Sequence, residues 1–171
     1  MKSAFATLIR QLNQRGWSWA TSTNYSYLDE NEQIWVSRSG VNKADFTEQD
    51  FMSIDHFGVG TGMYHGVKPS DETQIHLWIY NNFPEARVIL HSHSKFPVLI
   101  SQRNDKNFNV QGYELQKGFL GTKSHLDAIS IPIIENSQDM GVLCQDLNER
   151  RLDIQQHCFI IAAHGTYAWG K

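Results

Sequence analysis

Apolar residues near the start of the chain recur at helical spacing. Phe5, Leu8, Ile9 and Leu12 lie three or four positions apart, so their side chains share one face of a helix. Gly16 follows as a stop signal. This pattern predicts an amphipathic helix that packs its apolar stripe against a core.

A second helical pattern follows Pro69. Ser70 is a candidate N-cap, and acidic residues fill the first turn. Ile75, Trp78 and Ile79 then form an apolar side, and the pattern ends near Asn82, before a Phe-Pro pair. Other helices are predicted over 47–52 with Thr47 as the cap, over 96–100, over 113–119, and over 139–150 with Val142, Leu143 and Leu147 facing inward.

Short β-branched and apolar runs predict strands. Residues 20–26 are polar and predict no element. Strands are expected over 33–37, 87–90, 128–134 (where Pro132 suggests an edge or end position) and 158–163, with 167–169 as the hairpin partner of the last. Because helices and strands alternate irregularly, we expect a single layered α-β-α domain over residues 1–171 rather than repeated βαβ units.

Composition narrows the class of protein. The chain has 171 residues, of which 40% are hydrophobic and 19% charged, with a formal net charge of −3. This balance is typical of a globular domain, and no basic face suggests a nucleic-acid partner. No apolar stretch approaches a membrane span, and the N-terminus offers no secretory signal. Two cysteines cannot form a disulfide framework, so we expect a cytoplasmic protein in which both are structural.

Three histidines stand at the ends of predicted strands. His91 and His93 close the apolar run 88–90, and alternation along a strand places both imidazoles on one face. His164 ends the later run 160–163 and is followed by glycine. A single histidine at such a place is usually a hydrogen-bonded polar residue. Three together favour a metal site with one open position, suited to zinc and compatible with cobalt, nickel or iron.

Two carboxylates are candidates for the acid/base role. Glu72 lies in the first turn of its predicted helix, where it could simply complement the helix dipole. Glu114 lies in the run 111–115, where it could be a solvated surface charge. Spacing alone does not choose between these interpretations for either residue.

Small hydroxyl, amide and glycine residues gather at predicted turns and suggest a phosphate site. Such side chains, with the backbone N–H groups beside them, suit an anion, although they also suit ordinary turns. The candidates are Thr21, Asn24, Ser39, Gly40 and Ser70, with Lys43 able to add positive charge.

Taken in order, these motifs resemble the class II aldolase/adducin superfamily. The resemblance extends from about Leu8 to the end and is specific only in combination. Its motifs are Thr21-x-x-Asn24-x-Ser26, Ser39-Gly40, Pro69-Ser70-Asp71-Glu72, His91-Ser92-His93 and His164-Gly165. A sugar-phosphate dehydratase branch is favoured by four stretches and by the closing run: 39–43, 93–95, 112–118, 131–136 and 164–170.

The resemblance implies a three-layer fold with a mostly antiparallel central sheet, one zinc ion per subunit and a homo-oligomer, in relatives a tetramer. His91, His93 and His164 match the zinc ligands. Glu72 matches the catalytic carboxylate of the aldolase branch, and Glu114 the acid/base of the dehydratase branch. Phosphate-binding positions are matched by Thr21, Asn24, Ser39, Gly40 and Ser70.

Two departures from the family pattern stand out. Thr23 occupies a position where relatives commonly have glycine, and its Cβ limits how closely the backbone approaches a phosphate. The chain ends at Lys171, whereas relatives continue into C-terminal helices, so we expect those helices to be absent.

The expected function is metal-dependent dehydration of a small sugar phosphate, with Glu114 preferred as the acid/base. Two alternatives remain open. One is a zinc-dependent sugar-phosphate aldolase or epimerase with Glu72 as the base. The other is a non-catalytic interaction domain like the adducin head, against which the three histidines argue.

Overall fold

The computed structural model describes residues 2–103 and 105–171 of the chain. These residues form two compact units: residues 2–94 with Trp169–Lys171, and the described residues of 95–168. The last strand, β8 (Gly165–Gly170), begins in the second unit and ends in the first.

The first unit is built on an antiparallel sheet of strand order β3-β2-β1-β4. At the end of β8, the Gly170 carbonyl accepts a hydrogen bond of 2.7 Å from the Arg87 N–H just before β4. The helices and strands of this unit are α1 (Lys2–Gln14), β1 (Tyr25–Leu28), β2 (Ile34–Ser37), β3 (Phe51–Ile54), α2 (Thr73–Asn82) and β4 (Val88–Ser92).

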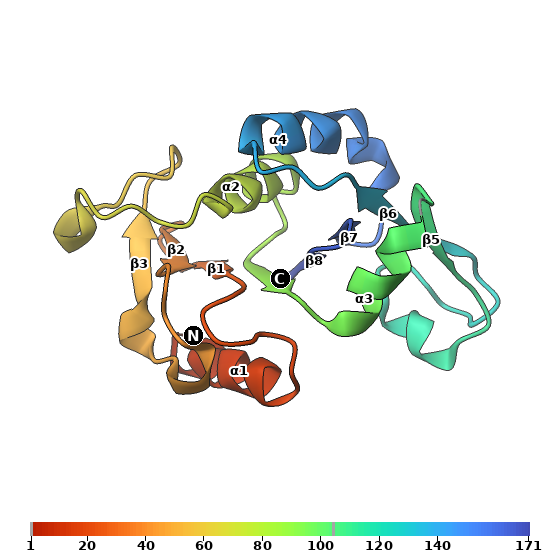
Figure 1. Cartoon of the computed structure of the whole chain (residues 1–171), viewed down its shortest axis with the longest axis horizontal. Helices are drawn as coiled ribbons and strands as arrows, with labels where there is room; N and C mark the ends of the chain where they lie inside the picture. The colour runs from red at the N-terminus through yellow and green to blue at the C-terminus, as the bar shows by residue number, and fades with distance from the viewer. Residues whose placement is uncertain (1, 104) are drawn as a thin grey trace. The chain divides into compact units, whose positions relative to one another are not determined.

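Alternation along β1 gives this unit three layers. Tyr25 and Tyr27 pack edge-on against Phe5 of α1, in a core cluster that includes Phe51. Ser26 lies between them and points to the other face, where its Oγ is 2.7 Å from Nδ1 of His76 on α2. Figure 1 shows α1 and α2 on opposite sides of β1 and β2.

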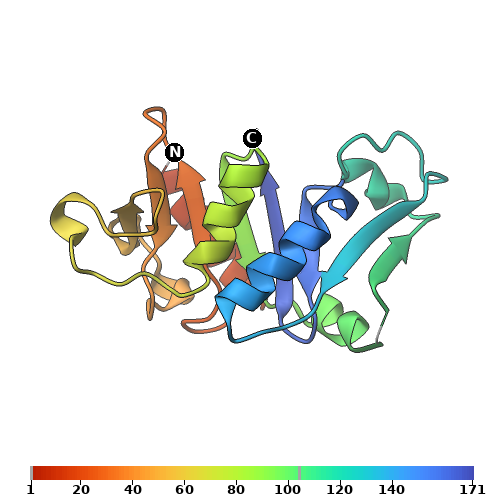
Figure 2. The same cartoon turned by 90° about the horizontal axis from the view of Figure 1, so that it is seen from above.

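The second unit contains a mixed sheet covered by α4. Strand β6 pairs antiparallel with β5 and parallel with β7, and β7 forms an antiparallel hairpin with β8. Leu143 and Leu147 of α4 are buried, and the helix lies across the strands (Figure 2). The elements are α3 (Lys95–Ile100), β5 (Asn107–Val110), β6 (Ile129–Ile134), α4 (Met140–Glu149), β7 (Cys158–Ile161) and β8, with a 3₁₀ helix η5 (Glu114–Gly118).

The predicted fold class is confirmed. Helices pack on a sheet whose described pairings are antiparallel apart from that between β6 and β7. The helices predicted at 5–12, 96–100 and 139–150 and the strands predicted at 33–37, 87–90 and 158–163 are all present. In the described part of the chain no helix is both long and apolar enough to cross a bilayer.

Some local predictions were wrong. The helix expected over 47–52 is a single 3₁₀ turn, Glu48–Asp50, because the next residues join β3. Ser70 does not cap α2: Glu72 occupies the N-cap position, and the Ser70 carbonyl accepts from Thr73 N–H in a preceding turn. Val142 is 57% exposed, since α4 turns Leu143 and Leu147 inward instead.

Pro132 lies within β6, a strand with partners on both sides, so the expected edge or end position was also wrong. Ile133 N–H donates towards the β5 side, to the Lys106 carbonyl. Successive backbone N–H groups of a strand alternate in direction, so the nitrogen of Pro132 faces β7. Pairing with β7 accordingly begins only after the proline, at Ile133.

Candidate metal and anion site

His91 and His93 converge at the end of β4. The His91 N–H donates to the Asn24 carbonyl (3.1 Å) and the His93 N–H to the Trp17 carbonyl (2.9 Å), so both backbones are fixed. His91 is fully buried, His93 is half-buried, and their Nε2 atoms lie 2.8 Å apart. The predicted common face is therefore confirmed, and two imidazole nitrogens point at one place.

Glu72 lies beside this pair. Its Oε2 is 3.4 Å from His91 Nε2 and accepts a hydrogen bond of 2.5 Å from Asn24 Nδ2. Its side chain is 22% exposed. Two imidazole nitrogens with a neighbouring carboxylate are a donor set that suits a divalent transition-metal ion.

His76 holds Asn24 from the opposite side. Its Nε2 lies 2.5 Å from Asn24 Oδ1 and its Nδ1 2.7 Å from Ser26 Oγ. Ser26 Oγ is also 2.8 Å from the Tyr80 hydroxyl. Burial lowers the His76 pKa to about 4, an effect that Glu72 opposes only in part. His76 is therefore neutral at pH 7, with one ring nitrogen donating and the other accepting.

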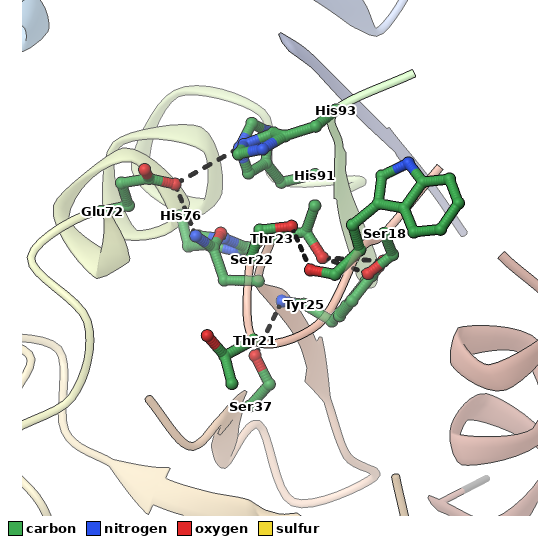
Figure 3. A network of polar contacts seen from close by, with 12 residues as sticks. Ser18, Thr21, Ser22, Thr23, Tyr25, Ser37, Glu72, His76, His91 and His93 are labelled. Atoms are coloured by element: carbon green, nitrogen blue, oxygen red, sulfur yellow. Dashed lines mark hydrogen bonds and ion pairs between the residues drawn. The ribbon is translucent and has the colours of Figure 1, made fainter. Parts of the chain in front are cut away.

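This neutral ring gives the contacts one consistent direction. The Glu72 carboxylate can only accept, so Asn24 donates to it and presents its carbonyl oxygen to His76. His76 Nε2 then donates to Asn24, and Nδ1 accepts from Ser26, which accepts in turn from Tyr80. The chain of donors ends at Glu72, next to His91 (Figure 3). Sequence analysis missed the roles of Ser26, His76 and Tyr80. The Asn24-x-Ser26 motif and the Glu72–His76 spacing pointed to the first two, and no sequence signal pointed to Tyr80.

The candidate phosphate residues lie in the first unit, on turns near this chain of hydrogen bonds. Thr21, Ser39 and Gly40 are exposed, Ser70 is half-buried, and Asn24 is buried. Gly40 has φ +76°, and nothing lies within 4 Å of a Cβ built on it. A turn with open space in front of its backbone is compatible with an anion.

Lys43 differs from the other candidates because it is buried, with a 1% exposed surface. Its Nζ donates to the carbonyls of Val41 (2.9 Å) and Thr21 (3.4 Å), and its backbone N–H donates to the Ala20 carbonyl (2.8 Å). Burial lowers its pKa to about 8, opposed by Asp50. The ammonium group therefore binds backbone and does not face solvent.

Thr23, the departure from the family pattern, adopts a left-handed backbone with φ +69°. This conformation is strained for a β-branched residue and free of strain for glycine. The Thr23 hydroxyl hydrogen-bonds Ser18 and donates to the Tyr25 hydroxyl (3.1 Å). These contacts offset part of the strain and turn the side chain inward (Figure 3).

The other two predicted site residues belong to the second unit. His164 is half-buried in the tight turn between β7 and β8, where its N–H donates to the Ile161 carbonyl (3.1 Å). Glu114 begins η5 and is 71% exposed, with Lys117 as an ion-pair partner and His125 Nδ1 at 3.6 Å. The three-histidine ligand set and the acid/base role of Glu114 both remain predictions.

Comparison with curated proteins gives relatives over nearly the whole chain. A methylthioribulose-1-phosphate dehydratase from Picosynechococcus sp. is 45% identical over 99% of this chain and 81% of its own length. A protein of the same name from Stenotrophomonas maltophilia is 37% identical over 95% of this chain and 76% of its own length.

Solved structures share the fold at low sequence identity. YgbL from Escherichia coli has a TM-score of 0.78 at 20% identity and covers 96% of this chain and 75% of its own. An L-fuculose-1-phosphate aldolase from Thermus thermophilus has a TM-score of 0.69, also at 20% identity, over 97% of this chain and 77% of its own.

A family model agrees with both comparisons. The model for the class II aldolase and adducin N-terminal domain matches residues 3–171. The chain therefore belongs to the class II aldolase and adducin family.

Proposed function

We propose that this chain catalyses the dehydration of 5-methylthioribulose 1-phosphate to 2,3-diketo-5-methylthiopentyl 1-phosphate, a lyase step of methionine salvage. The observation that supports it best is the 45% identity, over 99% of the chain, to a relative named for this activity. The convergent histidines and the candidate anion turns of the first unit supply the kinds of groups that this chemistry requires.

We infer that His91, His93 and His164 hold one divalent ion, zinc by preference. Support comes from the 2.8 Å convergence of the first two Nε2 atoms and from the family's metal-dependent members. When bound, such an ion acts as a Lewis acid towards the substrate's carbonyl oxygen. Asn24 and His76 hold the Glu72 carboxylate 3.4 Å from His91, which fixes the surroundings of the ligand.

Two proton transfers then complete the reaction. A base takes the proton from C3 of the substrate, and a carboxylic acid gives a proton to the hydroxyl on C4, which leaves as water. The resulting enol rearranges to the diketone. We assign the acid/base role to Glu114, because the surrounding stretch 112–118 is the part that resembles dehydratases rather than aldolases.

The phosphate group is assigned to the turns that carry Thr21, Asn24, Ser39, Gly40 and Ser70. Changing Ser39, an exposed residue of these turns, to alanine should raise KM far more than it changes metal content. The assignment fails if inorganic phosphate does not compete with the substrate.

One observation favours a second candidate, a sugar-phosphate aldolase or epimerase. Glu72, the carboxylate that matches the aldolase branch, lies beside His91, as a base near a metal would. Incubating the metal-loaded protein with methylthioribulose 1-phosphate and measuring product mass separates the two. Dehydration lowers the mass by one water, whereas aldol cleavage gives two smaller fragments and epimerisation leaves the mass unchanged.

We further propose a homo-oligomer, a tetramer by resemblance, working in the reducing cytoplasm. Both cysteines are free thiols, and burial raises the pKa of each. Light scattering of the purified protein measures the assembly directly.

A further inference from the structure

The loop after β2 presents a run of backbone N–H groups to the outside. The N–H groups of Ser39, Gly40 and Asn42 donate to no other group in the described parts of the chain, whereas the Val41 N–H closes the turn at 39–40. The loop bends at Gly40, whose φ of +76° is left-handed, and nothing stands within 4 Å in front of it. Successive backbone N–H groups in such a turn form a concave site that suits an anion.

Lys43 lies behind this loop and contacts it through a carbonyl. Its buried Nζ is 2.9 Å from the Val41 carbonyl oxygen. Because a trans peptide directs its C=O and N–H in opposite directions, this bond turns the N–H of Asn42 away from Lys43. The lysine side chain thus binds one side of the loop, and the Asn42 N–H points to the other side.

The same residue holds the second candidate turn. Its Nζ is 3.4 Å from the Thr21 carbonyl, and its backbone N–H donates to the Ala20 carbonyl. By the same geometry, the bond to Ala20 directs the Thr21 N–H away from Lys43. Ala20 itself has φ +49°, so this turn needs external contacts to keep its shape.

We propose that Lys43 is a positioning residue for the substrate's phosphate group: its ammonium group binds the carbonyls of Thr21 and Val41 and its backbone N–H that of Ala20, so that the N–H groups of Thr21 and Asn42 face the anion. The proposal rests on the phosphate site assigned above and adds the residue that shapes it. Lys43 contacts no phosphate itself, because its ammonium group is buried and engaged with backbone.

The charge of Lys43, as well as its hydrogen bonds, affects the proposed anion site. A buried ammonium group is normally unfavourable, and its lowered pKa of about 8 reflects that cost. At pH 7 it remains protonated and donates charge-assisted hydrogen bonds, which are stronger than neutral ones. A positive charge behind an anion site also favours binding of the dianion.

The test compares Lys43→Met with Lys43→Arg in the metal-loaded protein. Methionine keeps the apolar stem and the backbone bond to Ala20 and removes only the ammonium donors to Thr21 and Val41, whereas arginine keeps a charged donor. We expect Lys43→Met to weaken inhibition by inorganic phosphate at least tenfold and to raise KM similarly, with kcat and metal content changed less than threefold. Lys43→Arg should recover part of this loss. Lys106→Met, which removes an exposed lysine of the second unit, is the matched control and should leave phosphate inhibition unchanged.

Different failures have different meanings. Competitive inhibition of wild type by phosphate, unaltered in Lys43→Met, overturns the positioning role and leaves the phosphate site intact. Absence of competition in wild type overturns the phosphate assignment and this inference with it. If Lys43→Met does not fold, Lys43→Gln, which retains one donor, takes its place, and unchanged phosphate inhibition in that variant also overturns the role.

Discussion

The two units of the molecule use polar side chains in opposite ways. In the first, Glu72 is 22% exposed and is the end point of a buried chain of hydrogen bonds through Asn24 and His76. In the second, Glu114 is 71% exposed and is paired with Lys117 at the surface. One carboxylate is held by several neighbours at once, and the other is mostly in contact with solvent.

This difference in exposure and contacts indicates which role each carboxylate suits. A satisfied buried network is rigid, because each member is oriented by its neighbours and breaking it leaves unpaired groups in a low dielectric. Glu72 is thus suited to fix the geometry near His91. An exposed side chain keeps its rotamers and can exchange protons with solvent, which suits an acid/base that must be recharged in each cycle. The predictions below test this division.

Removing a histidine should have the largest effect. We expect His91→Ala and His164→Ala each to lose the bound metal and with it all measurable turnover, because three protein ligands are the usual minimum for such a site. Metal analysis of the purified variants measures this. His157→Ala is the control, since His157 lies outside the proposed site and should leave metal content unchanged. Wild-type metal content in both ligand variants would show that the site is wrong.

Exchanging each glutamate for glutamine compares the two regions directly. General acid–base catalysis contributes about 10²–10⁴-fold, so Glu114→Gln should lower kcat by about that factor and retain metal. Glu72→Gln should have a smaller effect on kcat, because glutamine can still accept from Asn24. Steady-state rates with product identified by mass provide the measurement.

The opposite result would reverse the division of roles. A near-normal kcat in Glu114→Gln beside a collapse in Glu72→Gln would make the buried carboxylate the base and favour the aldolase-type candidate. Leu115→Gln, which changes an exposed neighbour of Glu114, controls for a general disturbance of η5.

Much of the fold followed from periodicity, and the exceptions have physical causes. The helix 5–12 and the strand 87–90 are apolar on their buried side, so their patterns are unambiguous. Strand β1 was missed because it alternates tyrosine with a buried serine that pairs with α2, and the segment 20–26 therefore looks polar. Strand β5 carries asparagine at every second position and gives no continuous apolar run.

The site was predictable in residue type more than in arrangement. Strand alternation correctly placed His91 and His93 on one face, because it depends only on local geometry. The contact of Glu72 with His91 depends on how α2 packs on β4, which spacing does not encode. Lys43 was expected to add charge to a phosphate site; its burial results from long-range contacts with the turn 20–21, which no local pattern reveals.

The buried hydrogen-bond network of the first unit also predicts that the stability of the protein depends on pH. His76 has a pKa of about 4 in the folded state and about 6.5 when unfolded. Between these two pH values the unfolded chain binds a proton that the folded chain does not bind. The free energy of unfolding therefore decreases as the pH falls. From pH 7 to 4.5 this amounts to about 2–3 kcal/mol. Urea unfolding at both pH values, in the presence of a chelator, measures it.

His76→Gln supplies the control for this pH effect. Glutamine can donate to Asn24 but does not titrate, so the variant should lose about 2–3 kcal/mol less stability between pH 7 and 4.5 than wild type. Because both proteins keep the other titratable groups, those contributions cancel in the difference. Equal pH dependence in the two proteins would mean that His76 is not held neutral by the fold.

The smallest effect concerns the backbone just before Asn24. Thr23 has φ +69°, a region that costs an L-residue about 1–2 kcal/mol and costs glycine nothing. Thr23→Ala loses the hydroxyl contacts with Ser18 and Tyr25 and keeps the strain, whereas Thr23→Gly loses the same contacts and relieves it. Glycine should therefore be more stable than alanine here by about 1 kcal/mol, the reverse of their order in a helix or strand. Urea unfolding of the pair measures the difference directly. An alanine variant as stable as the glycine variant would show that the turn relaxes, and that the buried network does not hold Thr23 in its left-handed conformation.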